Sequence, residues 1–131
     1  MSNFTDPLIL LNIDGNLWKT EREFSYHVGS EDSADIITVP KGFLTDLASV
    51  PWPTSMLIPK SGKFNQAAVL HDYLYTIQTR PRSECDKIFL ESMKNLGVNW
   101  FLRGIMYRAV RIGGGFVWKK KKTNQNRRVI K

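Results

Sequence analysis

Residues 67–75 have the sequence Ala67-Ala68-Val69-Leu70-His71-Asp72-Tyr73-Leu74-Tyr75, which places a histidine and an aspartate inside an otherwise apolar run. A second stretch about twenty residues earlier does the same with Asp46 and Ser49: Val39-Pro40-Lys41-Gly42-Phe43-Leu44-Thr45-Asp46-Leu47-Ala48-Ser49-Val50-Pro51. An unpaired polar group in an apolar environment costs about 1–3 kcal/mol. We therefore expect these polar side chains either to pair with one another or to take part in chemistry.

Apolar residues in the second half of the chain recur at helical spacing. This spacing predicts helices over residues 65–78, 84–96 and 99–112. In the first helix His71 and Tyr75 lie one turn apart and share a face. Ser83 is the expected N-cap of the second helix, with Asp86 at its third helical position. The triplet Gly113-Gly114-Gly115 is expected to end the third helix.

Short apolar and alternating segments in the first forty residues predict β-strands. We expect these strands over residues 8–11, 17–28 and 36–39, with a break in the second strand near residues 20–22. The predicted fold class is therefore α+β, with a small N-terminal antiparallel sheet packed by about three C-terminal helices. The expected organisation is one domain over residues 1–115 and a basic C-terminal arm over residues 116–131.

The formal net charge of +7 is divided unevenly along the chain. Residues 1–91 contain eight basic and twelve acidic residues, and residues 92–131 contain eleven basic residues and no acidic one. The first segment therefore carries −4 and the second +11. Such opposed charges favour head-to-tail association with copies of the same chain, or docking onto an acidic partner.

The arm combines an apolar start with a basic run. Phe116 and Trp118 are expected to anchor it on the body of the protein. Its basic side chains are candidates to bind nucleic acid or an acidic protein surface, and the alternative is a solvated end. These side chains are Lys119, Lys120, Lys121, Lys122, Arg127 and Arg128.

Composition excludes several classes of protein. Cys85 is the single cysteine, so the chain forms no internal disulfide and no cysteine-only zinc site. Cys85 is expected to be inert unless a helix dipole lowers its pKa. No apolar run reaches the roughly 18 residues that span a bilayer. Residues 1–6 lack the basic segment of a secretion signal, which predicts a protein kept in a reducing cytoplasm.

Two hypotheses are open for His71. A histidine beside Asp72, with Asp46 nearby in space, could bind a divalent metal or act as a general base oriented by a carboxylate. Alternatively, His71 is a buried side chain satisfied by Asp46 or Asp72, which locks the strand region onto the first helix. No second histidine lies one turn away, and no glycine-flanked serine marks a nucleophile. The residues alone therefore leave a catalytic and a structural role open.

Taken in order, the two stretches resemble one family. The pattern Val-Pro-x-Gly-Phe-x-Thr-Asp-x-Ala-Ser-Val-Pro precedes Ala-Ala-Val-Leu-His-Asp-Tyr-Leu-Tyr, and the spacing continues through Arg80, Asp86, Phe89, Met93, Gly97-Val98, Arg103 and Met106-Tyr107. This order is similar to the family catalogued as domain of unknown function 1353, which is found mainly in tailed bacteriophages and prophages. The resemblance covers about residues 36–112. Trp52 and Cys85 depart from it, because a basic residue and an alanine are common there.

The resemblance implies a phage origin and a small α+β domain, but no settled activity. Its motif residues correspond here to Asp46, Ser49, His71, Asp72, Tyr75 and Asp86. One expected function is a virion component of the tail or head–tail connection, made in the host cytoplasm, that assembles with other phage structural proteins or with copies of itself. The other is a small envelope-directed hydrolase that uses Asp46, His71, Asp72 and Asp86, with or without a divalent metal.

Overall fold

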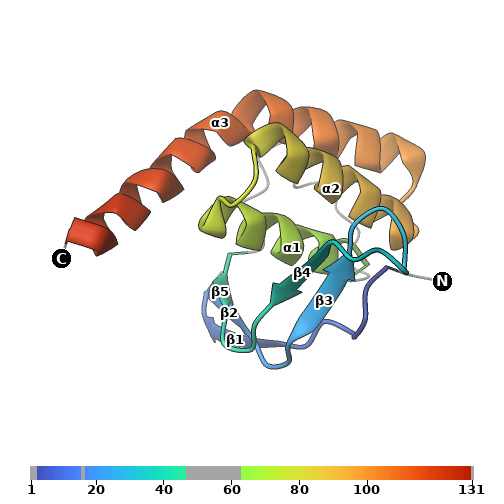
Figure 1. The fold of residues 1–131 in the computed structure, drawn as a ribbon, viewed down its shortest axis with the longest axis horizontal. Helices are drawn as coiled ribbons and strands as arrows, with labels where there is room; N and C mark the ends of the chain where they lie inside the picture. Colours follow the sequence, from blue (N-terminus) through green and yellow to red (C-terminus); the bar gives the residue numbers. More distant parts are fainter. Residues whose placement is uncertain (1–2, 16, 47–62, 131) are drawn as a thin grey trace.

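Two small antiparallel sheets form one side of the molecule, and three helices lie over them (Figure 1). The computed structural model describes residues 3–15, 17–46 and 63–130. One sheet has the order β1-β2-β5, and the other pairs β3 with β4. The strands are β1 (Leu10–Asp14), β2 (Leu17–Thr20), β3 (Phe24–His27), β4 (Ile36–Val39) and β5 (Leu44–Thr45). The predicted α+β class is therefore confirmed.

The strand predictions differ from the structure in their bounds. The segment predicted over 17–28 is divided at residues 21–23 into β2 and β3, which belong to different sheets. The strand predicted over 8–11 occurs at 10–14, where its register with β2 shifts between Asn12 and Asp14. Such a bulge adds one residue to a strand and bends it, which a simple alternation of side chains does not reveal.

Alternation along β3 and β4 places their apolar side chains on the core face. Phe24 pairs with Val39 and Tyr26 pairs with Ile37, and all four side chains are buried. Directly opposite residues of antiparallel strands share a face, so these pairs form a continuous apolar surface. This surface packs against the first helix.

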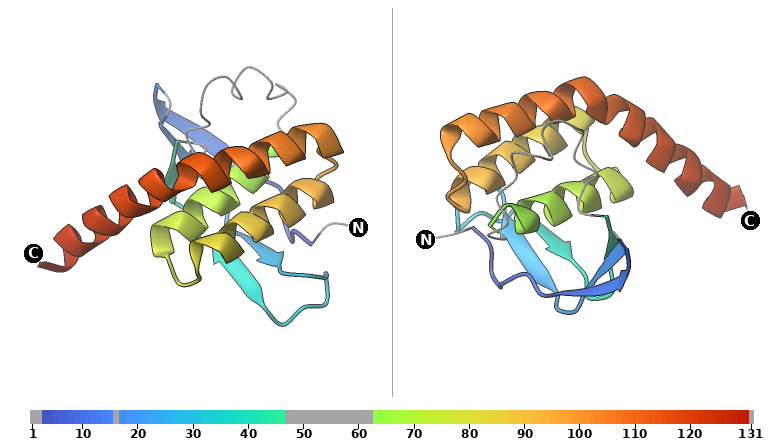
Figure 2. Two further views of the ribbon diagram at one scale, coloured as in Figure 1. Left: turned by 90° about the horizontal axis from the view of Figure 1, so that it is seen from above. Right: turned by 180° about the vertical axis from the view of Figure 1, so that it is seen from behind.

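The helix α1 (Lys63–Ile77) is the centre of the fold. Figure 2 shows it between the sheets on one side and α2 (Arg82–Asn95) and α3 (Trp100–Ile130) on the other. Val69, Leu70 and Leu74 face the sheet core, whereas Phe64 and Ala68 pack in the core between the helices. A helix that is apolar on nearly all sides must be buried on all sides, and α1 satisfies this requirement.

The start of α2 differs from the prediction. The helix begins at Arg82 with Pro81 at its N-cap, so Ser83 lies inside the first turn and makes no cap hydrogen bond. Proline is well suited to the boundary because it has no N–H group to satisfy. Asp86 consequently serves no capping role, and its side chain is fully buried.

The end of α3 also differs, because the helix continues through the three glycines to Ile130. Gly114 is buried, and a Cβ atom built there would lie 2.5 Å from the Tyr75 hydroxyl oxygen and 3.0 Å from Arg82 Nη1. The glycine therefore allows α3 to approach α1 and α2 closely. Figures 1 and 2 show α3 bending where its colour passes from orange to red, in the part of the chain that contains the glycines.

The predicted apolar anchor is only partly correct. The indole ring of Trp118 contacts the Tyr75 ring edge to face at a centroid distance of 5.1 Å. The backbone carbonyl oxygen of Trp118 accepts a 2.9 Å hydrogen bond from Gln78 Nε2. Phe116 instead points to solvent with 78% of its surface exposed. Contacts of this kind outweigh the low helix propensity of glycine. No helix of the described residues is long and apolar enough to cross a membrane.

Two adjacent glycines provide a matched test of this packing. Gly114→Ala should lower the free energy of unfolding by about 1 kcal/mol or more, because its methyl group overlaps the Tyr75 hydroxyl. Gly113→Ala should raise it by about 0.5–1 kcal/mol, because nothing lies within 4 Å and alanine favours the helix. Urea denaturation measures both. Equal effects of the two substitutions would contradict the close approach at Gly114.

Candidate functional site

The polar residues of the sequence motifs lie in a buried network between the helices. Two carboxylates form its centre: Asp86 on α2 is 0% exposed and Asp72 on α1 is 4% exposed. Each is contacted by residues from at least two other elements. Burying a charge is expensive unless it is paired and hydrogen-bonded, so the partners of these two carboxylates decide what the site can do.

Both oxygens of Asp86 accept hydrogen bonds. His71 Nε2 lies 2.8 Å from Oδ1 and the Tyr75 hydroxyl lies 2.6 Å from the same atom. Arg111 Nη1 lies 2.8 Å from Oδ2 and Arg82 Nη1 lies 3.5 Å from it. One carboxylate therefore connects α1, α2 and α3.

His71 is held by ring stacking as well as by this bond. Its imidazole is stacked on Phe89 at a centroid distance of 4.4 Å and lies 4.3 Å from the Tyr75 ring. The side chain is 4% exposed. An ionised carboxylate only accepts hydrogen bonds, so Nε2 carries the proton that it donates to Asp86. The prediction that His71 pairs with Asp46 or Asp72 is therefore wrong, because its partner is Asp86.

Arg82 extends the network along α3. Its Nη1 donates a 3.0 Å hydrogen bond to the carbonyl oxygen of Val110, and its Nη2 lies 3.4 Å from the carbonyl oxygen of Arg111. These carbonyls belong to the turn of α3 that precedes the glycine triplet, and a Cβ atom at Gly114 would lie 3.0 Å from the same Nη1. The guanidinium thus binds both the carboxylate on its own helix and the backbone of the neighbouring helix.

Asp72 has a separate set of partners. The Thr45 hydroxyl of β5 donates a 2.6 Å hydrogen bond to Oδ2, and Lys121 Nζ of α3 forms a 2.7 Å ion pair with Oδ1. Lys121 Nζ also lies 3.2 Å from Thr76 Oγ1. This second carboxylate therefore connects the sheet, α1 and the distal part of α3.

The protonation of these groups follows from their surroundings. Burial opposes ionisation of Asp86, but the hydrogen bonds from His71, Tyr75 and Arg111 outweigh it and hold its pKa below the usual value. Burial and the bond to Asp86 raise the pKa of Tyr75, so its hydroxyl stays protonated. Burial also raises the pKa of the Cys85 thiol to about 11, as expected for an inert cysteine.

The structure brings together only some of the predicted site residues. His71, Asp72, Tyr75 and Asp86 lie in the network, whereas the carboxylate of Asp46 is exposed. Ser49 lies outside the described residues. Within the described ranges, no group of three or more His, Cys, Asp or Glu is placed to hold a metal. A divalent metal therefore stays a prediction without support from this network.

The basic residues of the predicted arm have different environments. Lys121 turns inward to Asp72, whereas Lys119, Lys120 and Lys122 are exposed on α3. Arg127 and Arg128 continue the helix, and their side chains lie outside the described part of the structure.

Sequence reasoning missed four members of the network: Thr45, Arg82, Arg111 and Lys121. The only available signal was for Lys121, which lies on the same helical face as Val117 and Gly114 if the helix continues past the glycines. Treating the triplet as a helix end concealed this spacing. The partners of a buried charge are otherwise distant in sequence and depend on the tertiary fold.

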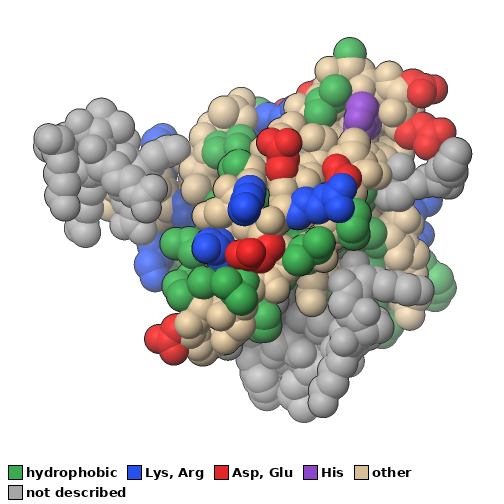
Figure 3. Space-filling model, turned by 90° about the horizontal axis from the view of Figure 1, so that it is seen from below, with side chains coloured by type: hydrophobic (Ala, Val, Ile, Leu, Met, Phe, Trp, Pro, Cys, Tyr) green, Lys and Arg blue, Asp and Glu red, His purple; other side chains and the backbone are tan. Residues whose placement is uncertain are grey.

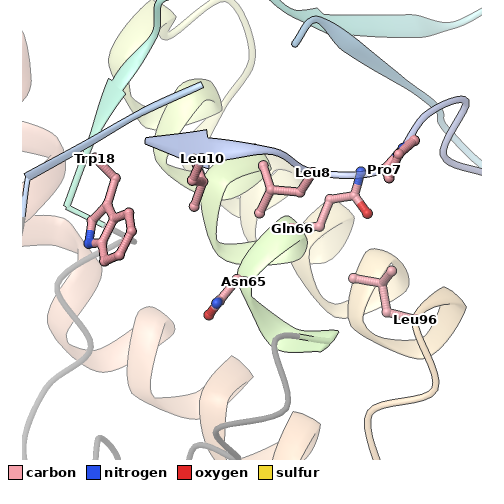
Figure 4. Close-up of a pocket in the computed structure, with 7 residues that line it drawn as sticks. All are labelled: Pro7, Leu8, Leu10, Trp18, Asn65, Gln66 and Leu96. Atoms are coloured by element: carbon pink, nitrogen blue, oxygen red, sulfur yellow. The ribbon is translucent and has the colours of Figure 1, made fainter. Parts of the chain in front are cut away.

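A pocket of about 390 Å³ lies apart from the network, between the strands and the start of α1 (Figure 4). Its lining residues are mainly apolar and include two amide side chains: Pro7, Leu8, Leu10, Trp18, Asn65, Gln66 and Leu96. Gln66 Nε2 donates a 2.8 Å hydrogen bond to the carbonyl oxygen of Asp6. None of these lining residues is titratable or nucleophilic, so they are suited to packing or binding and not to catalysis.

Comparison with family models identifies the family. The model for "Protein of unknown function (DUF1353)" matches residues 18–110. The chain belongs to the DUF1353 family. Searches of curated proteins and of solved structures found no match. In this DUF1353 protein the matched segment includes Thr45, both buried carboxylates and Arg82, whereas Arg111 and Lys121 lie beyond its end.

The network predicts how stability depends on pH. The pKa of Asp86 is lower in the folded protein than the value of about 3.9 in an unfolded chain, so its stabilising effect is present above about pH 4 and is lost as the pH falls. Asp86→Asn should lower the free energy of unfolding by about 3 kcal/mol at pH 7. The same substitution should make the fall of this free energy toward acid pH less steep. Urea denaturation between about pH 2 and 7 measures both effects.

Asp35→Asn is the matched control, because Asp35 forms an exposed ion pair with Arg80. Its cost at pH 7 should stay below about 1 kcal/mol. A cost for Asp86→Asn as small as that of Asp35→Asn would show that the network does not stabilise the fold.

The basic run offers a second matched set. Lys121→Met should cost about 2 kcal/mol, because it leaves the carboxylate of Asp72 buried without its cation. The double variant Lys121→Met/Asp72→Asn should recover part of this loss. Lys120→Met should change the free energy of unfolding by less than about 0.5 kcal/mol, since its side chain is exposed. Equal effects at positions 120 and 121 would contradict the inward ion pair.

Proposed function

We propose that this DUF1353 protein is a bacteriophage virion component, at the tail or head–tail connection, that acts by protein–protein assembly. The observation that carries the proposal is that the buried polar groups of the network form their hydrogen bonds with one another and with the backbone. In the described part of the chain, no buried side-chain nitrogen or oxygen lacks a hydrogen-bond partner. Four of the motif residues are thus engaged in holding elements of the fold together, which supports a structural role: His71, Asp72, Tyr75 and Asp86.

The hydrolase alternative depends on the same residues. A general base must reach its substrate, directly or through one water. His71 is 4% exposed, and its Nε2 is bonded to Asp86. Asp86 is in turn bonded to Arg111. A hydrolase would have to break these contacts in order to work, which favours assembly over catalysis.

An exposed apolar surface on the β1-β2-β5 sheet also supports assembly. We call it the outer sheet patch. Its five aliphatic side chains are 38–53% exposed: Ile9, Leu11, Ile13, Leu17 and Leu44. Figure 3, seen from the sheet side, shows hydrophobic side chains gathered over this sheet beside charged ones. Exposed aliphatic side chains gathered on one face are typical of interaction sites, and Lys19, which lies opposite both Leu11 and Leu44, adds a charge to this face.

Quantitative mass spectrometry of purified particles tests the proposal. In particles of the phage that encodes this chain, we expect a fixed number of copies that matches a ring symmetry. Leu11→Ser, which changes only the outer sheet patch, should lower that number while leaving the unfolding curve nearly unchanged.

Two results would overturn the proposal. The first is absence of the chain from purified particles. The second is degradation of bacterial envelope by the purified protein, with loss of this activity in His71→Gln at unchanged folding. The second result would establish the hydrolase.

A further inference from the structure

The helix α3 has a second apolar face, which is exposed in the described part of the structure. Leu102, Met106 and Gly114 face inward and are buried. On the opposite side Ile112 is 88% exposed and Phe116 is 78% exposed. Large apolar side chains at this exposure are costly in water, so a series of them along one helix face indicates an interaction surface.

The side chains on this outer side follow helical spacing, and all of them except the half-buried Ile105 are exposed. We call the set the outer stripe of α3; it consists of Phe101, Ile105, Arg108, Ile112, Phe116 and Lys119. The steps between successive members are four, three, four, four and three residues, which keeps them on one side of a helix. Steps of three and four residues are also the spacing by which one helix packs along another. A row of side chains along one side of a helix suits a single helix as its partner.

The charge of the stripe restricts the partner. Arg108 lies between Ile105 and Ile112, and Lys119 follows the last apolar member of the stripe; both cations are exposed. Residues 92–131 contain no acidic residue. Two α3 helices placed face to face would oppose these cations with no carboxylate between them. A partner helix must therefore be acidic. Its carboxylates would be spaced like Arg108 and Lys119, which are eleven residues or roughly 17 Å apart along a helix.

A lipid surface fits the stripe less well. Helices that lie on membranes carry their cations along the borders of the apolar face, from where they reach the phosphate groups. Arg108 and Lys119 instead point in the same direction as Ile112, so on a membrane they would face the hydrocarbon. On an acidic partner helix, the same two cations would lie opposite carboxylates.

We propose that the outer stripe of α3 binds an acidic amphipathic helix of another protein. Ile105 and Ile112 would pack against apolar residues of that helix, and Arg108 and Lys119 would pair with its carboxylates. This inference rests on the proposed assembly function and specifies the kind of partner involved.

Binding of a synthetic helix to the full-length protein tests the inference. The probe is a four-heptad peptide with leucine at the a and d positions, except for two glutamates eleven residues apart, and glutamate at e and g. A scrambled peptide of the same composition is its control. The heptad peptide should bind about tenfold more tightly than the scrambled one by fluorescence anisotropy. Ile112→Ser should weaken its binding by at least about tenfold.

Two further variants sharpen the test. Arg108→Glu should weaken binding of the acidic peptide and improve binding of a matched peptide with lysines in place of glutamates. Ile36→Ser is the control for removing an exposed isoleucine, since Ile36 is 49% exposed on β4 and distant in sequence from α3. The Ile36→Ser variant should bind the heptad peptide as tightly as the unmodified protein does.

Three results would overturn the inference. Equal binding of the heptad and scrambled peptides would show that the protein recognises only the charge of the peptide and not the spacing of its side chains. A dimer in light scattering that Ile112→Ser abolishes would make a second copy the occupant. The third result is sedimentation of the protein with phosphatidylglycerol vesicles that is lost in Ile112→Ser, together with no binding of the peptide. This result would make a lipid surface the occupant of the stripe. Because these assays use purified protein, their failure is distinct from absence of the chain from particles.

Discussion

The carboxylate of Asp86 is buried completely, and the arrangement of all three helices depends on its partners. His71 and Tyr75 reach it from α1, and Arg111 reaches it from α3. A charge in such a position is tolerated only while its hydrogen bonds are intact, so a shift of either helix would leave it unpaired. Asp72 imposes the same constraint between β5, α1 and the distal part of α3. Thr45, His71 and Asp72, which are polar residues of the two apolar motifs, therefore hold separate elements together.

This arrangement divides the basic second half of the chain into two roles. Arg111 and Lys121 point inward and neutralise the two buried carboxylates. Arg108 and Lys119 point outward on the same helix and leave positive charge on its surface. A helix that serves both roles must be continuous and must lie close to the body. Gly114 permits that close approach, which explains a glycine at a position where its helix propensity is unfavourable.

Much of the candidate site could be anticipated from the residues, but its pairing could not. A polar group in an apolar run must find a partner, and this rule correctly identified His71 and Asp72 as members of an internal site. It does not say which partner. Asp86 is fifteen residues from His71, and local rules treat an acidic residue near a helix start as a cap. The family resemblance grouped Asp86 with His71, but it did not predict the hydrogen bond between them. The actual role of Asp86 requires α2 to lie against α1.

The α+β class, the three helices and the segments of β1 to β4 follow from local periodicity and turn residues, so the amino-acid sequence was sufficient to predict them. The two-residue strand β5 was not predicted, because it depends on pairing with β2. The sequence also determined the opposed charges of the two halves. Three features depend on contacts between elements and could not be predicted: α3 continues past its glycines, Lys121 is internal, and Asp46 is exposed. Local propensity predicts a helix end at Gly113–Gly115, but contacts distant in sequence supply more free energy than the glycines remove.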